Sequence, residues 1–69
     1  MFKLNQFSHA DQLVLNTARS VGYRVALVVT LTIDGKILHS AQAIGHRADL
    51  FQHPSSGYEA VPLEAIEGL

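Results

Sequence analysis

The segment TLTIDGKILHSAQ, residues 30–42, decides the fold of this 69-residue chain. Asp34-Gly35 is a strong turn signal, and the residues on both sides of it are rich in Val, Ile, Leu and Thr. Apolar runs of this kind around a tight turn are typical of two antiparallel strands. We therefore predict a β-hairpin with strands at 23–33 and 36–45.

The register of this hairpin depends on the turn length, because a shift of one residue exchanges the two faces of each strand. A two-residue turn at Asp34-Gly35 would mix polar and apolar side chains on one face. A three-residue turn that starts at Ile33, with Gly35 in a bulge, separates them better. We expect this second register, which pairs Leu31 with Ile37, Val29 with His39, Leu27 with Ala41 and Val25 with Ala43. The opposite face then holds Thr30, Thr32, Lys36, Ser40 and Gln42.

In this register His39 lies on the apolar face. A buried neutral imidazole needs hydrogen-bond partners for its ring nitrogens, and a histidine in such a position is more often structural than catalytic. We expect His39, together with Val29 and Leu31, to form a core or oligomer contact; a ligand or catalytic role is the alternative. Protonation would bury a charge there, so such a contact would respond to pH.

Metal sites and catalytic motifs find little support in the sequence. The chain has no cysteine, which excludes disulfides and thiolate ligands. His39, His46 and His53 are seven residues apart, but Gly45 and Pro54 interrupt any helix that would align them. No nucleophile motif is present, and so short a chain has little room for a water-excluding cleft. We predict a protein that is not an enzyme and has no cofactor and no metal.

The segment FSHADQLVLNTARSVG, residues 7–22, predicts a helix at about 9–21. Ser8 suits the N-cap with Asp11 three residues later, and Gly22 supplies a left-handed end. The apolar residues at helical spacing are Ala10, Leu13, Val14, Ala18 and Val21, and Leu15 falls outside this stripe. We expect the stripe to pack on the hairpin residues Val25, Leu27, Val29, Leu31, Ile37 and Ala41.

The two ends of the chain complete the predicted fold. Weak alternation at 1–4 indicates a short first strand, residues 46–61 read as irregular, and Pro62 opens a short helix at about 62–67. The predicted fold class is α+β: one amphipathic helix packed on an antiparallel β-hairpin, in β-α-β-β order with a short C-terminal helix. We expect residues 1–69 to form a single small domain.

Composition favours association with another chain. Hydrophobic residues make up 48% of the sequence and charged residues 16%, against about 25% charged in ordinary domains. A chain of this size buries only about 60% of its unfolded surface, so a homodimer or a protein partner would add stability. No apolar run is long enough to span a membrane and no signal segment is evident, so the sequence predicts a cytoplasmic location.

The net charge of −1 argues against nucleic-acid binding. That activity would require Lys3, Arg19, Arg24, Lys36 and Arg47 to converge on one face.

Residue types enriched at binding hot spots gather in two places. Arg47, Phe51 and Tyr58 lie in the irregular segment, and Tyr23 and Arg24, which begin the first hairpin strand, can add to the same patch. The alternative is that Phe51 and Tyr58 fold back and cap the small core. We predict a non-catalytic protein–protein interaction module, homodimeric through a sheet edge or the second sheet face, that binds and modulates another protein, for example by inhibiting it. The alternative is a small-ligand-binding oligomer in which Tyr58, Phe51 and His39 line pockets between subunits.

Overall fold

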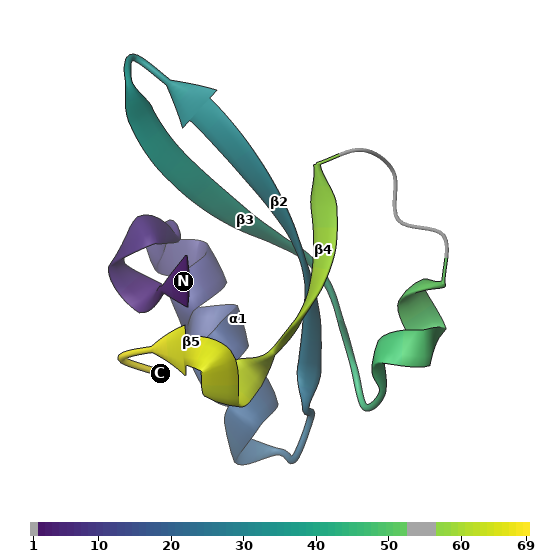
Figure 1. Cartoon of the computed structure of the whole chain (residues 1–69). Helices are drawn as coiled ribbons and strands as arrows, with labels where there is room; N and C mark the ends of the chain where they lie inside the picture. The colour runs from purple at the N-terminus through teal and green to yellow at the C-terminus, as the bar shows by residue number, and fades with distance from the viewer. Residues whose placement is uncertain (1, 53–56) are drawn as a thin grey trace.

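The computed structural model describes residues 2–52 and 57–69 and has an α+β architecture (Figure 1). Three strands form an antiparallel sheet in the order β3-β2-β4, and β1 and β5 form a separate parallel pair. The elements are β1 (Phe2–Lys3), the 3-10 turn η1 (Leu4–Gln6), α1 (His9–Ser20), β2 (Val25–Ile33), β3 (Lys36–Gly45), η2 (Ala48–Phe51), β4 (Tyr58–Pro62), η3 (Leu63–Ala65) and β5 (Ile66–Glu67). The predicted α+β class is confirmed, with more strands than the β-α-β-β order contains.

The C-terminal third differs most from the prediction. The segment 46–61, predicted as irregular, contains most of β4, and the predicted helix at 62–67 is a single 3-10 turn followed by β5. Pairing decides this outcome: Val61 lies opposite Ala26 on β2, and Ile66 lies opposite Phe2 on β1. These non-local partners override a local preference that sequence spacing alone reads as helical.

The predicted hairpin register is wrong. The turn has two residues, and both Asp34 (φ 50°) and Gly35 (φ 76°) lie in the left-handed region that a type I′ turn requires. β2 and β3 therefore pair Ile33 with Lys36, Leu31 with Leu38, Thr30 with His39 and Val29 with Ser40. The irregularity lies further along: Val28 pairs with Ala41 but Leu27 pairs with Ala43, so Gln42 is the extra residue of a bulge.

The bulge also explains why a two-residue turn does not place polar and apolar side chains together on one face, as a regular hairpin with that turn would. It reverses the alternation of β3, so that Ala41 and Ile44 both point to the core, on what we call the inner face of the sheet. The inner face also contributes Ala26, Val28 and Val61. Leu27, Val29 and Leu31, predicted to face the helix, alternate with these residues and lie on the opposite, outer face.

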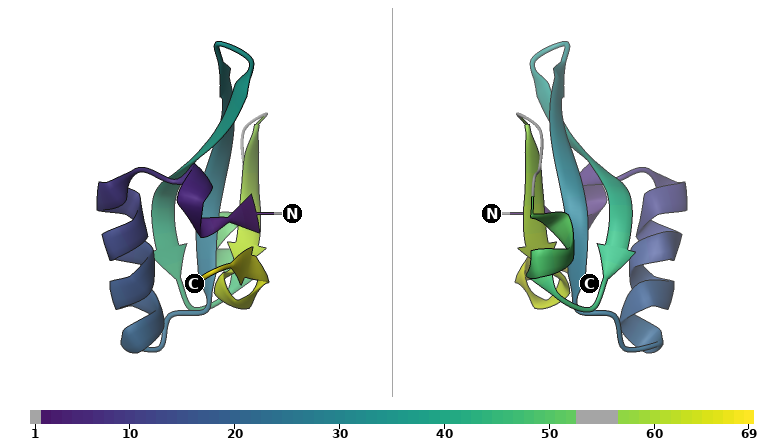
Figure 2. Two further views of the ribbon diagram at one scale, coloured as in Figure 1. Left: turned by 90° about the vertical axis from the view of Figure 1, so that its left-hand side faces the viewer. Right: turned by 90° about the vertical axis from the view of Figure 1, so that its right-hand side faces the viewer.

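Helix α1 lies beside the edge strand β3, as Figure 2 shows. The predicted cap is present, since Ser8 Oγ accepts the N–H of Asp11 at 3.1 Å. The Asp11 carboxylate in turn accepts a hydrogen bond from the N–H of Ala41 at 3.3 Å, on the edge of β3 that is not paired with β2. Leu15 and Ala18 follow Asp11 at i+4 and i+7, and both are buried.

The predicted helix stripe is therefore mostly wrong. Of its members Ala18 is buried, whereas Ala10, Leu13, Val14 and Val21 are exposed. The reason is that the terminal segments, not this stripe, cover the rest of the inner face. Their contributions are Phe2, Leu4, Phe7, Leu63, Ile66 and Leu69.

Candidate binding site

His39 is placed as a core contact. It is buried on the inner face, a 3.0 Å hydrogen bond joins its Nδ1 to Thr30 Oγ1, and its ring packs against Phe2 and Phe7 at centroid distances of 4.6 and 5.6 Å. Burial lowers the pKa of His39 below its ordinary value of 6.5, and the carboxylate of Glu59 partly opposes this effect. Val29 and Leu31, predicted to share its contact, lie on the outer face instead.

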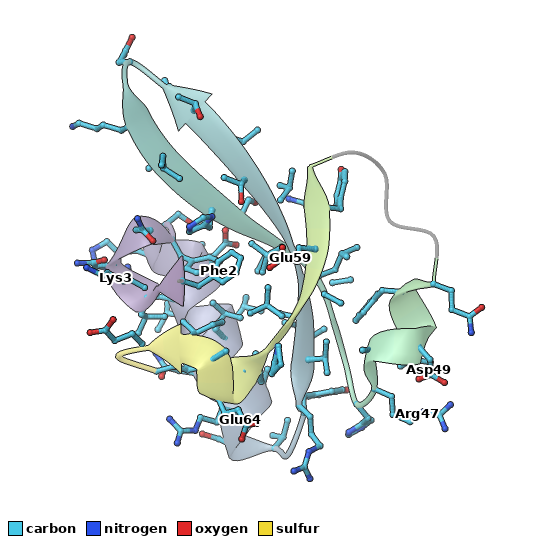
Figure 3. The ribbon with its side chains drawn as sticks, in the orientation of Figure 1. Phe2, Lys3, Arg47, Asp49, Glu59 and Glu64 are labelled. Carbon is cyan, nitrogen blue, oxygen red and sulfur yellow. The ribbon has the colours of Figure 1, made fainter. Side chains whose placement is uncertain are left out.

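A cavity of about 520 Å³ lies where α1 ends, β2 begins and β3 and β4 end. Three of the chain's five lysine and arginine residues line it. We call it the basic cavity; its lining residues are Arg19, Gly22, Tyr23, Arg24, Val25, His46, Arg47, Ala48, Pro62, Leu63 and Glu64. Figure 3 shows Arg47 and Glu64 at this same end of the molecule, on different elements.

The end of α1 fixes Tyr23 in the basic cavity. Gly22 has a φ of 95°, its N–H donates to the carbonyl of Arg19 at 3.1 Å, and the Tyr23 N–H donates to the carbonyl of Ala18 at 2.9 Å. These two bonds are those of a Schellman motif, which glycine in the left-handed conformation allows. The ring of Tyr23 stacks on His46 with centroids 4.5 Å apart and an interplanar angle of 21°.

Two hydrogen bonds fix the backbone of Arg24, one to Gly45 and one to Leu63. Its N–H donates to the carbonyl of Gly45 at 3.2 Å, and its carbonyl accepts the N–H of Leu63 at 2.8 Å. The side chain of Arg24 therefore starts from a rigid position between the end of β3 and η3.

The lining of the cavity has a net positive charge, because it contains three arginines and one carboxylate, that of Glu64. Arg19 donates to the backbone oxygen of Leu69. Arg47 Nε lies 3.2 Å from Asp49 Oδ1 in a solvent-exposed pair, and such pairs contribute little stability. Planar guanidinium groups recognise carboxylate and phosphate oxygens in bidentate geometry.

An apolar groove adjoins the basic cavity. It has a volume of about 400 Å³ and is lined by Leu13, Val14, Thr17, Ala18, Val21, Tyr23 and Ile44. We call it the helix groove. Tyr23 lines both hollows and so forms their common border.

The structure divides the five predicted partner-binding residues into two groups. Tyr23, Arg24 and Arg47 meet in the basic cavity. Tyr58 lies on β4 opposite Val29, and Phe51 packs against Gly45, where an added Cβ would lie 3.2 Å from the Phe51 ring. Because His39 faces the core, it shares no face of the sheet with Tyr58 or Phe51.

Sequence reasoning did not connect Arg19 and His46 with this cavity, and it assigned the apolar lining of the helix groove to the core. The helix sequence itself contained a signal for the helix groove. Its apolar residues occupy more of the helix surface than one short helix can bury at the edge of a sheet, so some of them must remain exposed. Convergence of all five basic residues on one face is not observed, since Lys3 lies on β1 and Lys36 directly follows the hairpin turn.

Within residues 2–52 and 57–69, no group of three or more histidine, aspartate or glutamate side chains is arranged to hold a metal ion. His53 lies outside these residues. In the same part of the chain, no helix has both the length and the apolar character needed to cross a membrane. Comparison with known proteins gives no match to a family model, a curated protein or a solved structure.

Proposed function

We propose that this chain is a non-catalytic protein-interaction module that forms a homodimer and acts by binding and modulating another protein. The observation that supports this best is the amount of large apolar side chain left exposed on a small molecule. The exposed residues with large apolar side chains include Leu13, Val14, Val21, Leu31, Ile33, Ile37, Leu38, Leu50 and Tyr58.

The hairpin end, residues 30–39, supports the homodimer. Within the described residues, the register of β2 with β4 ends at Val29 opposite Tyr58, and one further bond joins the Thr30 N–H to the Gly57 carbonyl at 3.3 Å. The pairing of β2 with β3 continues to Ile33 opposite Lys36. The hairpin end consequently projects beyond β4 (Figure 1). A two-stranded segment is marginally stable by itself, and this one exposes apolar side chains on both of its faces.

The side chains of the hairpin end support contact with a second copy of the chain. Leu31, Ile33 and Leu38 form an apolar row on the outer face, and a two-fold arrangement would bury the row of each copy against that of the other. Asp34 is the first residue of the turn and Lys36 directly follows the turn, so two opposite charges lie together at the tip of the hairpin and the tip has no net charge.

Sedimentation velocity at micromolar concentration tests the homodimer. We expect the wild type to sediment as a dimer and Leu31→Lys to sediment as a folded monomer. Leu13→Lys is the matched control, because it places the same charge on another exposed leucine, which lies on α1 and outside the hairpin end, and it should remain dimeric. A well-folded wild-type monomer would overturn the homodimer.

The alternative, a small-ligand-binding oligomer, receives less support because Tyr58, Phe51 and His39 do not share a face. A thermal-shift screen with nucleotides, flavins and divalent metal ions separates the two functions. We expect no shift in melting temperature with any of these compounds. A clear shift would favour the alternative.

A further inference from the structure

The basic cavity and the helix groove meet at Tyr23 and together form one surface with an apolar half and a cationic half. We propose that this composite surface binds a segment of the protein partner in which large apolar side chains stand next to carboxylates. The inference rests on the proposed protein-binding function and adds the chemistry of the segment that is bound.

The apolar half has the dimensions of a short peptide contact. Leu13 on α1 is 69% exposed, and Val21, the C-cap residue of α1, is 64% exposed. At about 1.5 Å per helical residue, the distance along the helix axis from Leu13 to Val21 is about 12 Å. A groove of that length accommodates two or three apolar side chains of a bound segment.

The cationic half selects for carboxylates. The backbone of Arg24 is anchored to Gly45 and Leu63, so its guanidinium group can bind an anion with less loss of conformational freedom. The side chain of Arg47 forms an exposed pair with Asp49, and a carboxylate from a partner can replace that aspartate at small cost. The Glu64 carboxylate repels an acidic segment but is outnumbered by the three arginines.

The distribution of charge favours a peptide over a membrane or a nucleic acid. The only lysine or arginine of α1 is Arg19, whereas an amphipathic helix that lies on a lipid surface is rich in lysine and arginine on its polar face. Nucleic acids require a basic stripe, but Lys3 and Lys36 lie on other parts of the chain and the net charge is −1.

Selection from a random-sequence peptide display library tests the proposal with the intact chain as bait. We expect enrichment of peptides that combine leucine, isoleucine or aromatic residues with neighbouring aspartates or glutamates. Synthetic copies of the enriched peptides are then measured by fluorescence anisotropy. Enrichment of basic peptides, or no enrichment at all, would overturn the proposal.

Two variants test the halves of the surface separately, and both replace exposed residues. Leu13→Ser should weaken binding of the enriched peptides about tenfold by removing apolar contact, and Arg24→Glu should weaken it about tenfold by opposing the carboxylates. Leu31→Ser and Lys36→Glu, on the hairpin end, are the matched controls and should leave binding unchanged. Equal loss in all four variants, or loss in none of the first two, would contradict the assignment.

Two further measurements use other probes. Vesicles containing phosphatidylglycerol and a single-stranded oligonucleotide should not retain the wild type, and retention that Arg24→Glu abolishes would overturn the peptide assignment. The homodimer is measured by sedimentation and depends on Leu31. A failure of the composite surface is therefore distinguishable from a failure of the proposed function.

Discussion

At the scale of single residues, His39 shows how a polar side chain is accommodated in a small core. Its Nδ1 shares a hydrogen bond with Thr30, and the rings of Phe2 and Phe7 enclose its imidazole. The folded chain therefore favours the neutral form of His39, because a charged ring would lose solvation without gaining an ionic partner in contact. The unfolded chain does not bury the His39 ring and therefore does not favour its neutral form in this way.

We predict that this preference makes stability depend on pH. Burial lowers the pKa of His39 in the folded state, so the unfolded state binds a proton more readily. The stabilisation is complete above the ordinary pKa of 6.5 and is lost as the pH falls through the lowered value. Urea unfolding between pH 7.5 and pH 5 should show this decrease in the wild type and a smaller decrease in His39→Leu. An identical pH dependence in both proteins would contradict the assignment.

At the scale of elements, the orientation of α1 determines which surface remains available to a partner. Asp11 binds the edge of β3, and Leu15 and Ala18 are buried on the same side of the helix. This orientation turns Leu13 and Val14 outward into the helix groove. The same contact that covers part of the β3 edge thus creates the apolar half of the composite surface.

The orientation of α1 in the structure buries Leu15, whereas the orientation predicted from spacing would bury Leu13. The two orientations therefore make opposite predictions for the loss of stability when each leucine is replaced. Leu15→Ala should lower the free energy of unfolding by about 3 kcal/mol, because Leu15 is fully buried in the core. Leu13→Ala should change it by less than about 0.5 kcal/mol, because Leu13 is largely exposed. Chemical denaturation of both variants measures the difference. A larger loss for Leu13→Ala would mean that the stripe predicted from spacing faces the core after all.

The elements also show which parts of the fold could be predicted from sequence. Ser8, Gly22 and Asp34-Gly35 act through local backbone geometry, so the helix ends and the position of the hairpin turn were accessible. The bulge at Gln42 and strand β4 depend on pairing with β2, which no local pattern reveals. The orientation of α1 depends on what else covers the inner face, and those residues come from both ends of the chain.

At the scale of the whole molecule, the proposed homodimer and the proposed peptide contact use different surfaces. The hairpin end lies at one end of the long strands, and the basic cavity lies where those strands begin and end at the other. Residue types alone suggested one patch of Tyr58, Phe51, Arg47, Tyr23 and Arg24. The structure separates Tyr58 from Tyr23 and Arg24 because Tyr58 lies opposite Val29, further along β2 than Val25, which directly follows Arg24.

The two surfaces should respond differently to salt. The homodimer contact is mainly apolar, and apolar association is not weakened by screening. The peptide contact includes exposed arginines, whose attraction for carboxylates is screened over a Debye length that falls from about 10 Å at 0.1 M to about 3 Å at 1 M salt. We predict that raising sodium chloride over this range weakens binding of the enriched acidic peptides several-fold and leaves the sedimentation coefficient of the dimer unchanged. Dissociation of the dimer by salt would show that charged groups, rather than the apolar row, hold the two copies together. Peptide binding that does not depend on salt would show that the arginines do not contact the peptide and that the helix groove alone binds it.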